Sequence, residues 1–193
     1  MKRVGTPPLF FPSFRIEPQS TACASGCDIQ EVQEFLYRCA QQAIHQQQHV
    51  VWITAQTDLP HEISQFQQSS PYFHVLQKNR LSVLFEQPDV ETFTSKWKEY
   101  CEQHPVDFMI LDNINEIACH QSDAIREFFT ASRRFREHQT LIIGSQETTA
   151  RIGIQGIVGT IIKHSADLLL SIDGRSGHVV KNRYGMSNEM FTF

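Results

Sequence analysis

Residues 106–113 read VDFMILDN, an apolar run that ends in Asp112 and Asn113. Short runs of aliphatic and aromatic residues are typical of strands that are buried on both faces of a sheet. Two similar runs stand before and after it in the chain, at residues 49–55 (HVVWITA) and 140–143 (TLII). The three runs therefore predict three buried strands of one parallel sheet.

Stretches with helical spacing of their apolar residues separate these runs. Asp28 is followed three residues later by Glu31, a capping-box pattern, so the first helix is predicted to begin at Asp28. Further predicted helices cover residues 62–69, 90–101 and 124–138. This alternation of strands and helices indicates an α/β domain whose sheet is covered on both faces.

In the last third of the chain, predicted strands and helices alternate less regularly. Predicted strands at residues 166–172 and 178–181 flank a turn at residues 173–177, and a final strand is predicted at residues 189–193. Because a short turn joins antiparallel strands, this part is expected to add antiparallel strands at the C-terminal edge of the sheet. One more strand is predicted earlier, at residues 81–85.

Length and composition indicate one globular domain. The chain has 193 residues, of which 40% are hydrophobic and 20% are charged. Residues 1–18 are rich in proline and are predicted to form an extended arm laid over the body, with Phe10, Phe11 and Phe14 as its anchors. Residues 19–193 are predicted to form the single domain.

Charge, hydropathy and cysteine content argue against several classes of protein. A net charge of −4 and a pI near 6.1 do not suit a protein that coats nucleic acid over its whole surface. No apolar run approaches the roughly 20 residues of a transmembrane helix, and prolines interrupt the start of the chain, where a signal peptide is apolar. Five cysteines, an odd number, favour reduced thiols. We therefore expect a cytoplasmic protein that contacts no membrane.

The glutamine- and histidine-rich residues 41–49 are predicted to be the solvated end of the first helix. Other polar residues stand where the predicted strands end: Gln56 after the first run, Asp112 in the second and Gln146 after the third. Ligands of open α/β sheets bind beyond the carboxyl ends of the strands, so these residues mark a candidate site. An aspartate there suits Mg²⁺ beside a nucleotide, or it simply caps a loop, and the residues alone leave both roles open.

Residues 180–189 read VKNRYGMSNE, which resembles the KNRFGxxNE stretch of the RadA ATPase domain. Residues 141–145 (LIIGS), the glycine-containing loop at 149–159 and residues 162–173 (IKHSADLLLSID) occur in the same order as their counterparts in that family. The chain therefore resembles the RecA-like ATPase core of the RadA, DnaB and KaiC branch. This resemblance implies a RecA-like three-layer sandwich.

The phosphate-binding loop that the resemblance implies is degenerate. Such a loop has the form GxxxxGK[ST], in which glycines let the backbone approach the phosphates and the lysine binds them. With Gly26 aligned on the last glycine, Cys27 replaces the lysine and Asp28 the hydroxyl residue. Gln56 matches the glutamate that activates water in the family, and an amide cannot accept that proton. The resulting degenerate nucleotide site comprises Gly26, Cys27, Asp28, Gln56, Asp112 and Gln146.

Two further groups of residues are candidates for partner contacts. In the helicase branch, the lysine and arginine that match Lys181 and Arg183 reach the nucleotide of a neighbouring subunit, so the resemblance implies trans-acting fingers. The alternative is a solvent-facing basic edge strand. A second candidate is the loop that matches the family's DNA-facing loop, although its apolar residues also suit a protein contact. Its candidate residues are Arg151, Gly153, Gly156, Gly159 and Lys163.

The sequence thus predicts a pseudo-ATPase rather than an enzyme: a non-hydrolysing RecA-fold adaptor or regulatory subunit that acts through protein–protein contacts in DNA replication, repair or recombination. The expected partner is a RecA-like or helicase-type ATPase, within a homo- or hetero-oligomer. Two alternatives stay open: a divergent active ATPase that uses Asp112 for Mg²⁺, and an ATP-independent DNA-binding protein. No metal ion and no cofactor is expected.

Overall fold

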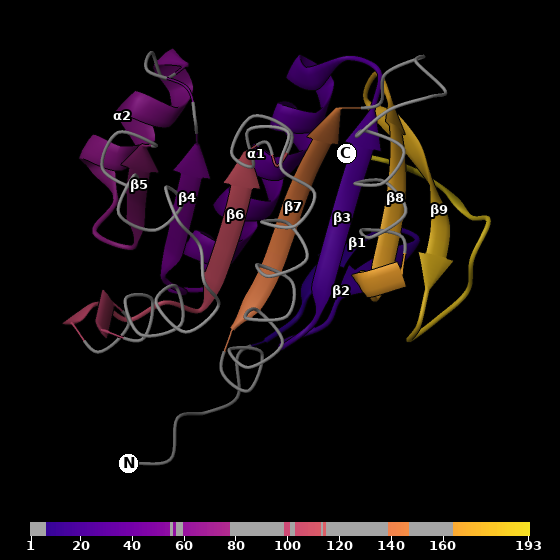
Figure 1. Cartoon of the computed structure of the whole chain (residues 1–193), viewed down its shortest axis with the longest axis horizontal. Coiled ribbons are helices and arrows are strands. Elements are labelled where there is room, and N and C mark those ends of the chain that lie inside the picture. The colour runs from indigo at the N-terminus through magenta and orange to yellow at the C-terminus, as the bar shows by residue number, and fades with distance from the viewer. Residues whose placement is uncertain are drawn as a thin grey trace.

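The computed structural model describes residues 7–54, 56, 60–77, 99–100, 103–112, 114, 139–146 and 164–193. These residues build an α/β fold around an eight-stranded sheet with the strand order β10-β9-β8-β3-β7-β6-β4-β5 (Figure 1). The strands of this sheet are β3 (Thr21–Gly26), β4 (Val50–Thr54), β5 (Phe73–Gln77), β6 (Phe108–Asp112), β7 (Thr140–Gln146), β8 (Leu168–Asp173), β9 (Ser176–Asn182) and β10 (Met190–Thr192).

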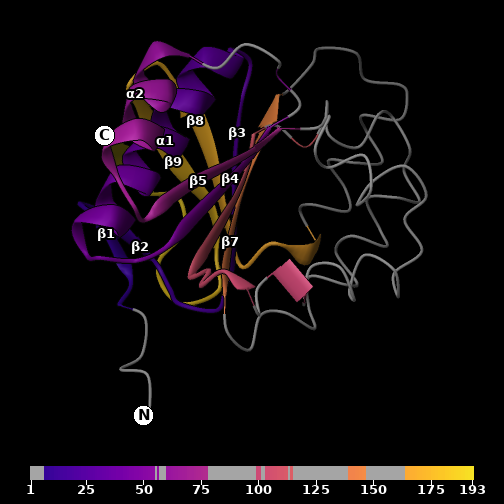
Figure 2. The ribbon, with the colours of Figure 1, turned by 90° about the vertical axis from the view of Figure 1, so that its left-hand side faces the viewer.

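The sheet is mostly parallel. Every pair among β3 to β8 is parallel, whereas β9 runs antiparallel to both β8 and β10. This confirms the predicted α/β class and the antiparallel strands at the C-terminal edge. The helices α1 (Ile29–His45) and α2 (His61–Ser69) lie on the same side of the sheet (Figure 2). In the part of the chain that the structure describes, no helix combines the length and apolar character that a bilayer-spanning segment needs.

Two strands of the sheet are not predicted by the sequence. β3 (TACASG) is poor in the β-branched and aromatic residues that favour strands, yet it lies inside the sheet. It is held there because β7 and β8 pair with it on either side and bury nearly all of it. β5 (FHVLQ) is the other missed strand. The strand predicted at residues 81–85 and the helix predicted at 124–138 lie outside the described residues, as does most of the helix predicted at 90–101.

Helix α1 packs against β3, β6 and β7. Its buried face consists of Val32, Phe35, Leu36, Cys39, Ala40 and Ala43. β7 continues through Gly144 instead of ending there, because this glycine makes room for α1. A Cβ atom on Gly144 would lie 2.7 Å from Leu36 Cδ1, closer than carbon atoms can pack. Gly144 therefore sets the close approach of helix and sheet rather than breaking the strand.

The N-terminal arm is a hairpin of β1 (Leu9–Phe11) and β2 (Phe14–Ile16). Phe11 and Phe14 stack with ring centroids 4.8 Å apart, and both contact Phe35 of α1. Phe14 also meets Phe191 of β10 edge to face, with centroids 4.8 Å apart. Two of the three predicted anchors are therefore confirmed. Phe10 is not an anchor, because the pleat places its side chain on the outer face of the hairpin, where it is 58% exposed.

Glutamine side chains at the end of α1 hold this arm in place. Gln42 accepts a hydrogen bond from the Phe10 N–H and donates one to the Phe10 carbonyl, both at 2.7 Å. Gln46 and Gln48 donate to the carbonyls two and three residues before Phe10. The prediction that residues 41–49 are merely a solvated helix end is therefore wrong, because these amides satisfy backbone groups of the arm.

Candidate functional site

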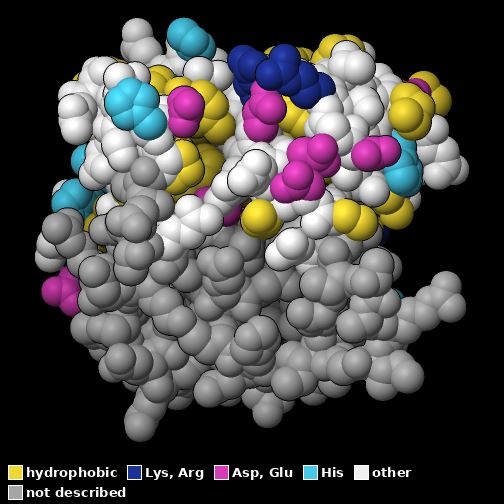
Figure 3. All heavy atoms as spheres, turned by 90° about the horizontal axis from the view of Figure 1, so that it is seen from above, with side chains coloured by type: hydrophobic (Ala, Val, Ile, Leu, Met, Phe, Trp, Pro, Cys, Tyr) yellow, Lys and Arg dark blue, Asp and Glu magenta, His cyan; other side chains and the backbone are white. Residues whose placement is uncertain are grey.

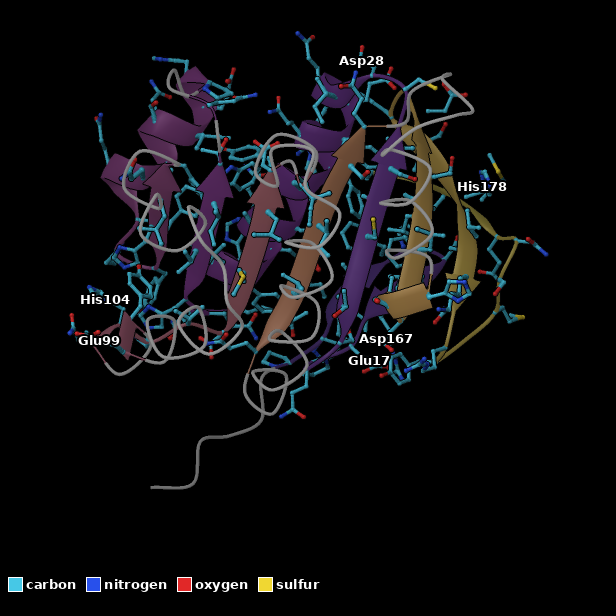
Figure 4. The ribbon with its side chains drawn as sticks, in the orientation of Figure 1. Glu17, Asp28, Glu99, His104, Asp167 and His178 are labelled. Atoms are coloured by element: carbon cyan, nitrogen blue, oxygen red, sulfur yellow. The ribbon has the colours of Figure 1, made fainter. Side chains whose placement is uncertain are left out.

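The candidate site lies at the carboxyl ends of the parallel strands, where the fold class predicts it. β3 ends at Gly26, and Asp28 is the N-cap of α1. Figure 4 shows Asp28 at the end of the sheet toward which the arrows of β3, β6 and β7 point. Because only Cys27 separates the strand from the helix cap, the connection has no room for a loop of the GxxxxGK[ST] form.

Gly26 is the last residue of β3 and so belongs to the strand rather than to a loop. A Cβ atom on Gly26 would lie 2.9 Å from the carbonyl oxygen of Ile172 and 3.2 Å from Val32 Cγ2. A glycine here lets β8 and α1 close on β3. The glycine of this segment therefore serves packing rather than phosphate binding.

The carboxylate of Asp28 occupies the N-terminus of α1. Its Oδ1 accepts a hydrogen bond from the Gln30 N–H at 2.8 Å, which confirms the predicted cap. Helix N-termini bind phosphate through such free N–H groups and through the helix dipole. Gln146, at the end of β7, donates from Nε2 to the Cys27 carbonyl at 3.3 Å and ties the connection to the neighbouring strand. The anion site of the fold is thus taken by the chain's own side chain.

Asp112 ends β6 and is 1% exposed. Gln33 of α1 donates from Nε2 to both of its carboxylate oxygens, at 3.1 Å and 3.0 Å. A carboxylate held on the helix side in this way is poorly placed to bind Mg²⁺, which prefers to keep several water ligands. Among the described residues, no group of three His, Cys, Asp or Glu side chains could hold a metal ion. Among the described residues of this edge, Asp112 is therefore engaged by the helix and belongs to no such group.

Gln56 lies at the same edge of the sheet as Asp112. Its backbone N–H donates to Thr54 Oγ1 at 3.1 Å, and Thr54 is the register partner of Asp112 in the neighbouring strand. The structure thus brings together Asp28, Gln56, Asp112 and Gln146, as the sequence predicts. None of the four has the chemistry of a lysine that binds phosphate or of a glutamate that activates water.

Gln33 is the residue of this site that the sequence analysis missed. It follows Ile29 by four positions and precedes Leu36 by three, so it lies beside the apolar stripe of the first helix. A polar residue at such a position is a signal, because an amide that is even partly buried needs a partner. That partner is Asp112.

Lys181 and Arg183 bind their own chain. Lys181 Nζ donates to the carbonyl of Ala166 at 2.6 Å, and Arg183 Nη1 lies 2.6 Å from Asp167 Oδ1. Asp167 is buried and also accepts a hydrogen bond from the Thr21 N–H at 3.0 Å. The prediction of a solvent-facing basic edge strand holds only in part. β10 pairs with β9 at residues 176–178, which leaves the Lys181 end of β9 without a second strand beside it among the described residues, but the Lys181 side chain is partly buried and bonds inward. In this structure both side chains hold the start of β8.

The two groups of candidate residues lie at opposite ends of the sheet. Figure 4 shows Asp167 near the end from which β3 starts, and Asp28 at the end where β3 finishes. The loop candidates Arg151, Gly153, Gly156, Gly159 and Lys163 lie outside the described residues.

A cavity of about 480 Å³ lies between α1 and α2, beside Gln33. Arg38 and Arg175 both approach Glu34 Oε1, at 3.6 Å and 3.4 Å. Figure 3 looks onto this end of the molecule and shows Lys and Arg side chains beside Asp and Glu side chains. The two guanidinium groups share one carboxylate, so much of the charge in this cavity is balanced internally.

Burial also shifts the acidity of individual side chains. It raises the pKa of the Cys39 thiol far above its ordinary value, which keeps that thiol protonated and unreactive. Burial, together with repulsion from the positive charges of His104 and His49, lowers the pKa of His74. The rings of His74 and His104 lie 6.1 Å apart at the edge of the sheet that carries β5.

No protein-family model matches this chain, and no curated protein matches it.

Proposed function

We propose that the chain is a RecA-like pseudo-ATPase: a non-hydrolysing adaptor or regulatory subunit that acts through protein–protein contacts in DNA replication, repair or recombination. The observation that carries this proposal is the connection between β3 and α1, which consists of Cys27 and the N-cap Asp28. A nucleoside triphosphate needs a glycine-rich loop and a lysine at this place. The chain has a carboxylate there instead.

The strand order supports a RecA-like origin of the scaffold. β3, the strand before the first helix of the domain, lies between β7 and β8, and the following strand β4 lies further along the sheet on the β7 side. At the point where the strand order reverses, successive strands are added on opposite sides, and a crevice forms at the carboxyl ends of the strands. α/β proteins bind nucleotides in this crevice. The crevice of this sheet is the place that Asp28 and Gln146 close.

Electrostatics support the absence of hydrolysis. Asp28 would place a negative charge beside the phosphates, and like charges at a few ångströms repel each other. Gln56 cannot serve as a general base, whose contribution to the rate is about 10²–10⁴-fold. Asp112 is already bonded to Gln33. Together, these three positions support the proposal that the chain keeps the fold of an ATPase but does not hydrolyse ATP.

The proposal includes a protein partner of the RecA-like or helicase type, in a homo- or hetero-oligomer. We expect this assembly in the cytoplasm, where thiols such as Cys23 and Cys39 stay reduced.

Titration with a fluorescent ATP analogue and Mg²⁺ tests the nucleotide half of the proposal. We expect no saturable binding below about 100 μM, an affinity corresponding to roughly 5–6 kcal/mol. An active RecA-type ATPase, measured under the same conditions, is the positive control. Binding that is tighter than this and is lost in Asp112→Ala would show a divergent active ATPase instead.

Affinity purification of the tagged full chain tests the partner half. The expected result is a RecA-like or helicase-type ATPase that co-purifies in a fixed ratio. Its ATPase rate should respond to the added chain without any hydrolysis by the chain itself. Direct binding of single-stranded DNA with a steep salt dependence, and without such a partner, would favour the DNA-binding alternative.

A further inference from the structure

The large hydrophobic side chains that are exposed in the described part of the chain belong to the N-terminal hairpin and to the region from β9 to β10. They are Phe10, Val180, Tyr184, Met186 and Met190. Met186 is 73% exposed, Met190 68% and Tyr184 50%. Three of them, Phe10, Tyr184 and Met186, line one groove, and exposed apolar side chains that share a groove mark a candidate contact site.

A groove of about 250 Å³ runs between the hairpin and the loop that connects β9 to β10. Phe10 and Arg15 line it from the hairpin, and Tyr184, Met186 and Glu189 line it from the loop. We call it the hairpin groove. Phe10 and Arg15 are cross-strand partners in the hairpin, which puts both side chains on its outer face.

The walls of the hairpin groove are fixed to each other. Ser13 Oγ donates to the Met190 carbonyl at 2.7 Å, and the ring of Phe14 packs against that of Phe191. The loop wall is held by the Tyr184 N–H, which donates to Asn182 Oδ1 at 3.0 Å. The groove is therefore largely formed before any ligand arrives, which lowers the entropic cost of binding.

Among the described residues, one carboxylate beside the hairpin groove has no ion-pair partner. Arg15 is paired with Glu17, and Arg183 is paired with Asp167. Glu189 is partly buried and forms no ion pair with any residue that the structure describes. An unbalanced carboxylate attracts a cation and repels the phosphates of nucleic acids and nucleotides.

The apolar lining of the groove favours a particular kind of cation. The rings of Phe10 and Tyr184 offer faces to which a guanidinium or ammonium group is attracted. The flexible thioether of Met186 adapts to the hydrocarbon stem of a long side chain. Aromatic rings, a methionine and one carboxylate together fit an arginine or lysine side chain with apolar neighbours.

The backbone of β2 also has hydrogen-bonding groups that face away from β1, where no other described strand pairs with it. The N–H and carbonyl of Phe10 bind Gln42, so they do not bind Arg15 across the hairpin. The antiparallel pattern then turns the N–H and carbonyl of Arg15 away from β1. Among the described strands, β2 pairs with β1 alone. An extended segment can therefore add itself along Arg15, as in other complexes that form by strand addition.

We propose that the hairpin groove is the docking site for an extended segment of a protein partner that carries an arginine or lysine between apolar residues. The basic side chain lies against Glu189 and the rings of Phe10 and Tyr184, and an apolar neighbour packs on Met186. This inference rests on the proposed function, because an adaptor needs a surface for its partner. The inference adds the place on the chain where the partner binds and the kind of side chains that the bound segment carries.

Fluorescence polarisation with three labelled peptides tests this proposal on the full chain. The first probe is Gly-Leu-Val-Arg-Val-Leu-Gly with blocked ends; in the second and third, glutamate and norleucine replace the arginine. We expect the arginine peptide to bind about tenfold more tightly than the norleucine peptide and the glutamate peptide to bind most weakly, in line with a cation–π contact plus an ion pair.

Variants of the chain locate the binding. Glu189→Gln and Tyr184→Ala are each expected to weaken binding of the arginine peptide about five- to tenfold, as for residues at the centre of a small interface. Glu189→Gln should leave binding of the norleucine peptide unchanged. The matched control is Val180→Thr, which alters an exposed apolar side chain outside the groove and should change neither affinity. Unfolding temperatures confirm that all variants fold.

Several results would overturn the proposal. These are equal affinity for the three peptides, no binding of any peptide, or binding that Glu189→Gln and Tyr184→Ala leave unchanged. Dimerisation of the wild-type chain that Met186→Ser abolishes, seen by analytical ultracentrifugation, would make a second copy the occupant. Binding of single-stranded DNA that Tyr184→Ala abolishes would make nucleic acid the occupant.

The two proposals fail separately. Tight ATP binding that depends on Asp112 would overturn the proposed function, regardless of the results with the peptides. If ATP does not bind and the peptides fail, only the hairpin groove is lost as the docking site, and the adaptor needs another surface.

Discussion

The carboxyl ends of the parallel strands and the hairpin groove are opposites in how they use polar and apolar side chains. At the strand ends, the carboxylates of Asp28 and Asp112 are bonded to the chain's own N–H and amide groups. In the hairpin groove, Glu189 has no ion-pair partner among the described residues, and Tyr184 and Met186 are exposed. Ligand sites need unsatisfied groups, so the comparison directs the search for function to the groove rather than to the usual nucleotide site of the fold.

The residues at the strand ends also contribute to the stability of the fold. A binding site costs stability because it keeps charges and glycine loops that are satisfied only by the ligand. Here Gly26 packs, Asp28 caps and Asp112 binds Gln33, so each position contributes to folding instead. Three substitutions and one pH series test the packing and the contacts described above.

The largest effect is expected from Phe35→Ala. Phe35 is fully buried and its ring contacts Phe11, Phe14, Phe191 and Phe193, so the variant leaves a cavity under the hairpin. The free energy of unfolding should fall by about 3–5 kcal/mol. Phe10→Ala is the matched control and should cost well under about 1 kcal/mol, as for an exposed side chain. Urea unfolding curves of both variants check this, and a similar loss in both would contradict the described packing.

A smaller loss is expected from Gly26→Ala. The new methyl group would lie 2.9 Å from the backbone carbonyl of Ile172, and a backbone atom cannot move aside as a side chain can. Overpacking of this kind costs about 1–3 kcal/mol. Thermal unfolding checks it. Gly174→Ala serves for comparison: its Cβ meets no atom, but its backbone is in the left-handed region, so it should lose about 1–2 kcal/mol from backbone strain without any clash. A Gly26→Ala variant as stable as the wild type would show that β3 is not packed as described.

Arg183→Ala is expected to cost about 1 kcal/mol, at the upper end for a pair with an exposed partner, because Asp167 itself is buried. The same variant distinguishes a structural role from a finger that acts on a neighbouring subunit. With a co-purified ATPase at hand, Arg183→Ala should lower the stability of the chain without changing stimulation of that ATPase. A loss of stimulation in a folded variant would restore the finger interpretation.

The smallest effect is expected from pH. Because the folded-state pKa of His74 is below its ordinary value near 6.5, the unfolded chain binds more protons than the folded chain in this range. Stability should therefore be full above about pH 7, decline as the pH falls below 6.5, and level off once the pH is below the folded-state pKa. Unfolding midpoints between pH 5 and 8, roughly the range in which histidine titrates, should vary less in His74→Gln. If the unfolding midpoint of His74→Gln depends on pH as strongly as that of the wild type, groups other than His74 cause the dependence.

Much of the fold could be predicted from the sequence because the periodicity was strong. Asp28 and the apolar spacing after it correctly mark the start of α1, and the runs HVVWITA, VDFMIL and TLII correspond to β4, β6 and β7. β3 could not be predicted because its small residues gain strand conformation only from the neighbours on either side. Tertiary context overrides weak local propensity in such a strand.

The candidate site was predicted in part. Gln56, Asp112 and Gln146 are brought to one edge, since parallel strands end together. The bond between Gln33 and Asp112 depends on how α1 turns above the sheet, which no pattern within either segment encodes. The hairpin groove escaped prediction for a similar reason, because its walls come from the two ends of the described chain.

The contact between the hairpin and β10 also bears on the order of events during synthesis. The bond from Ser13 to the Met190 carbonyl joins residues 177 positions apart, and β3 acquires both neighbours only after residues 140–173 have been made. The hairpin and β3 therefore leave the ribosome long before their partners exist. Such distant pairing slows folding and exposes apolar segments in the meantime. We expect the nascent chain to need protection until Phe191 emerges to cover Phe14.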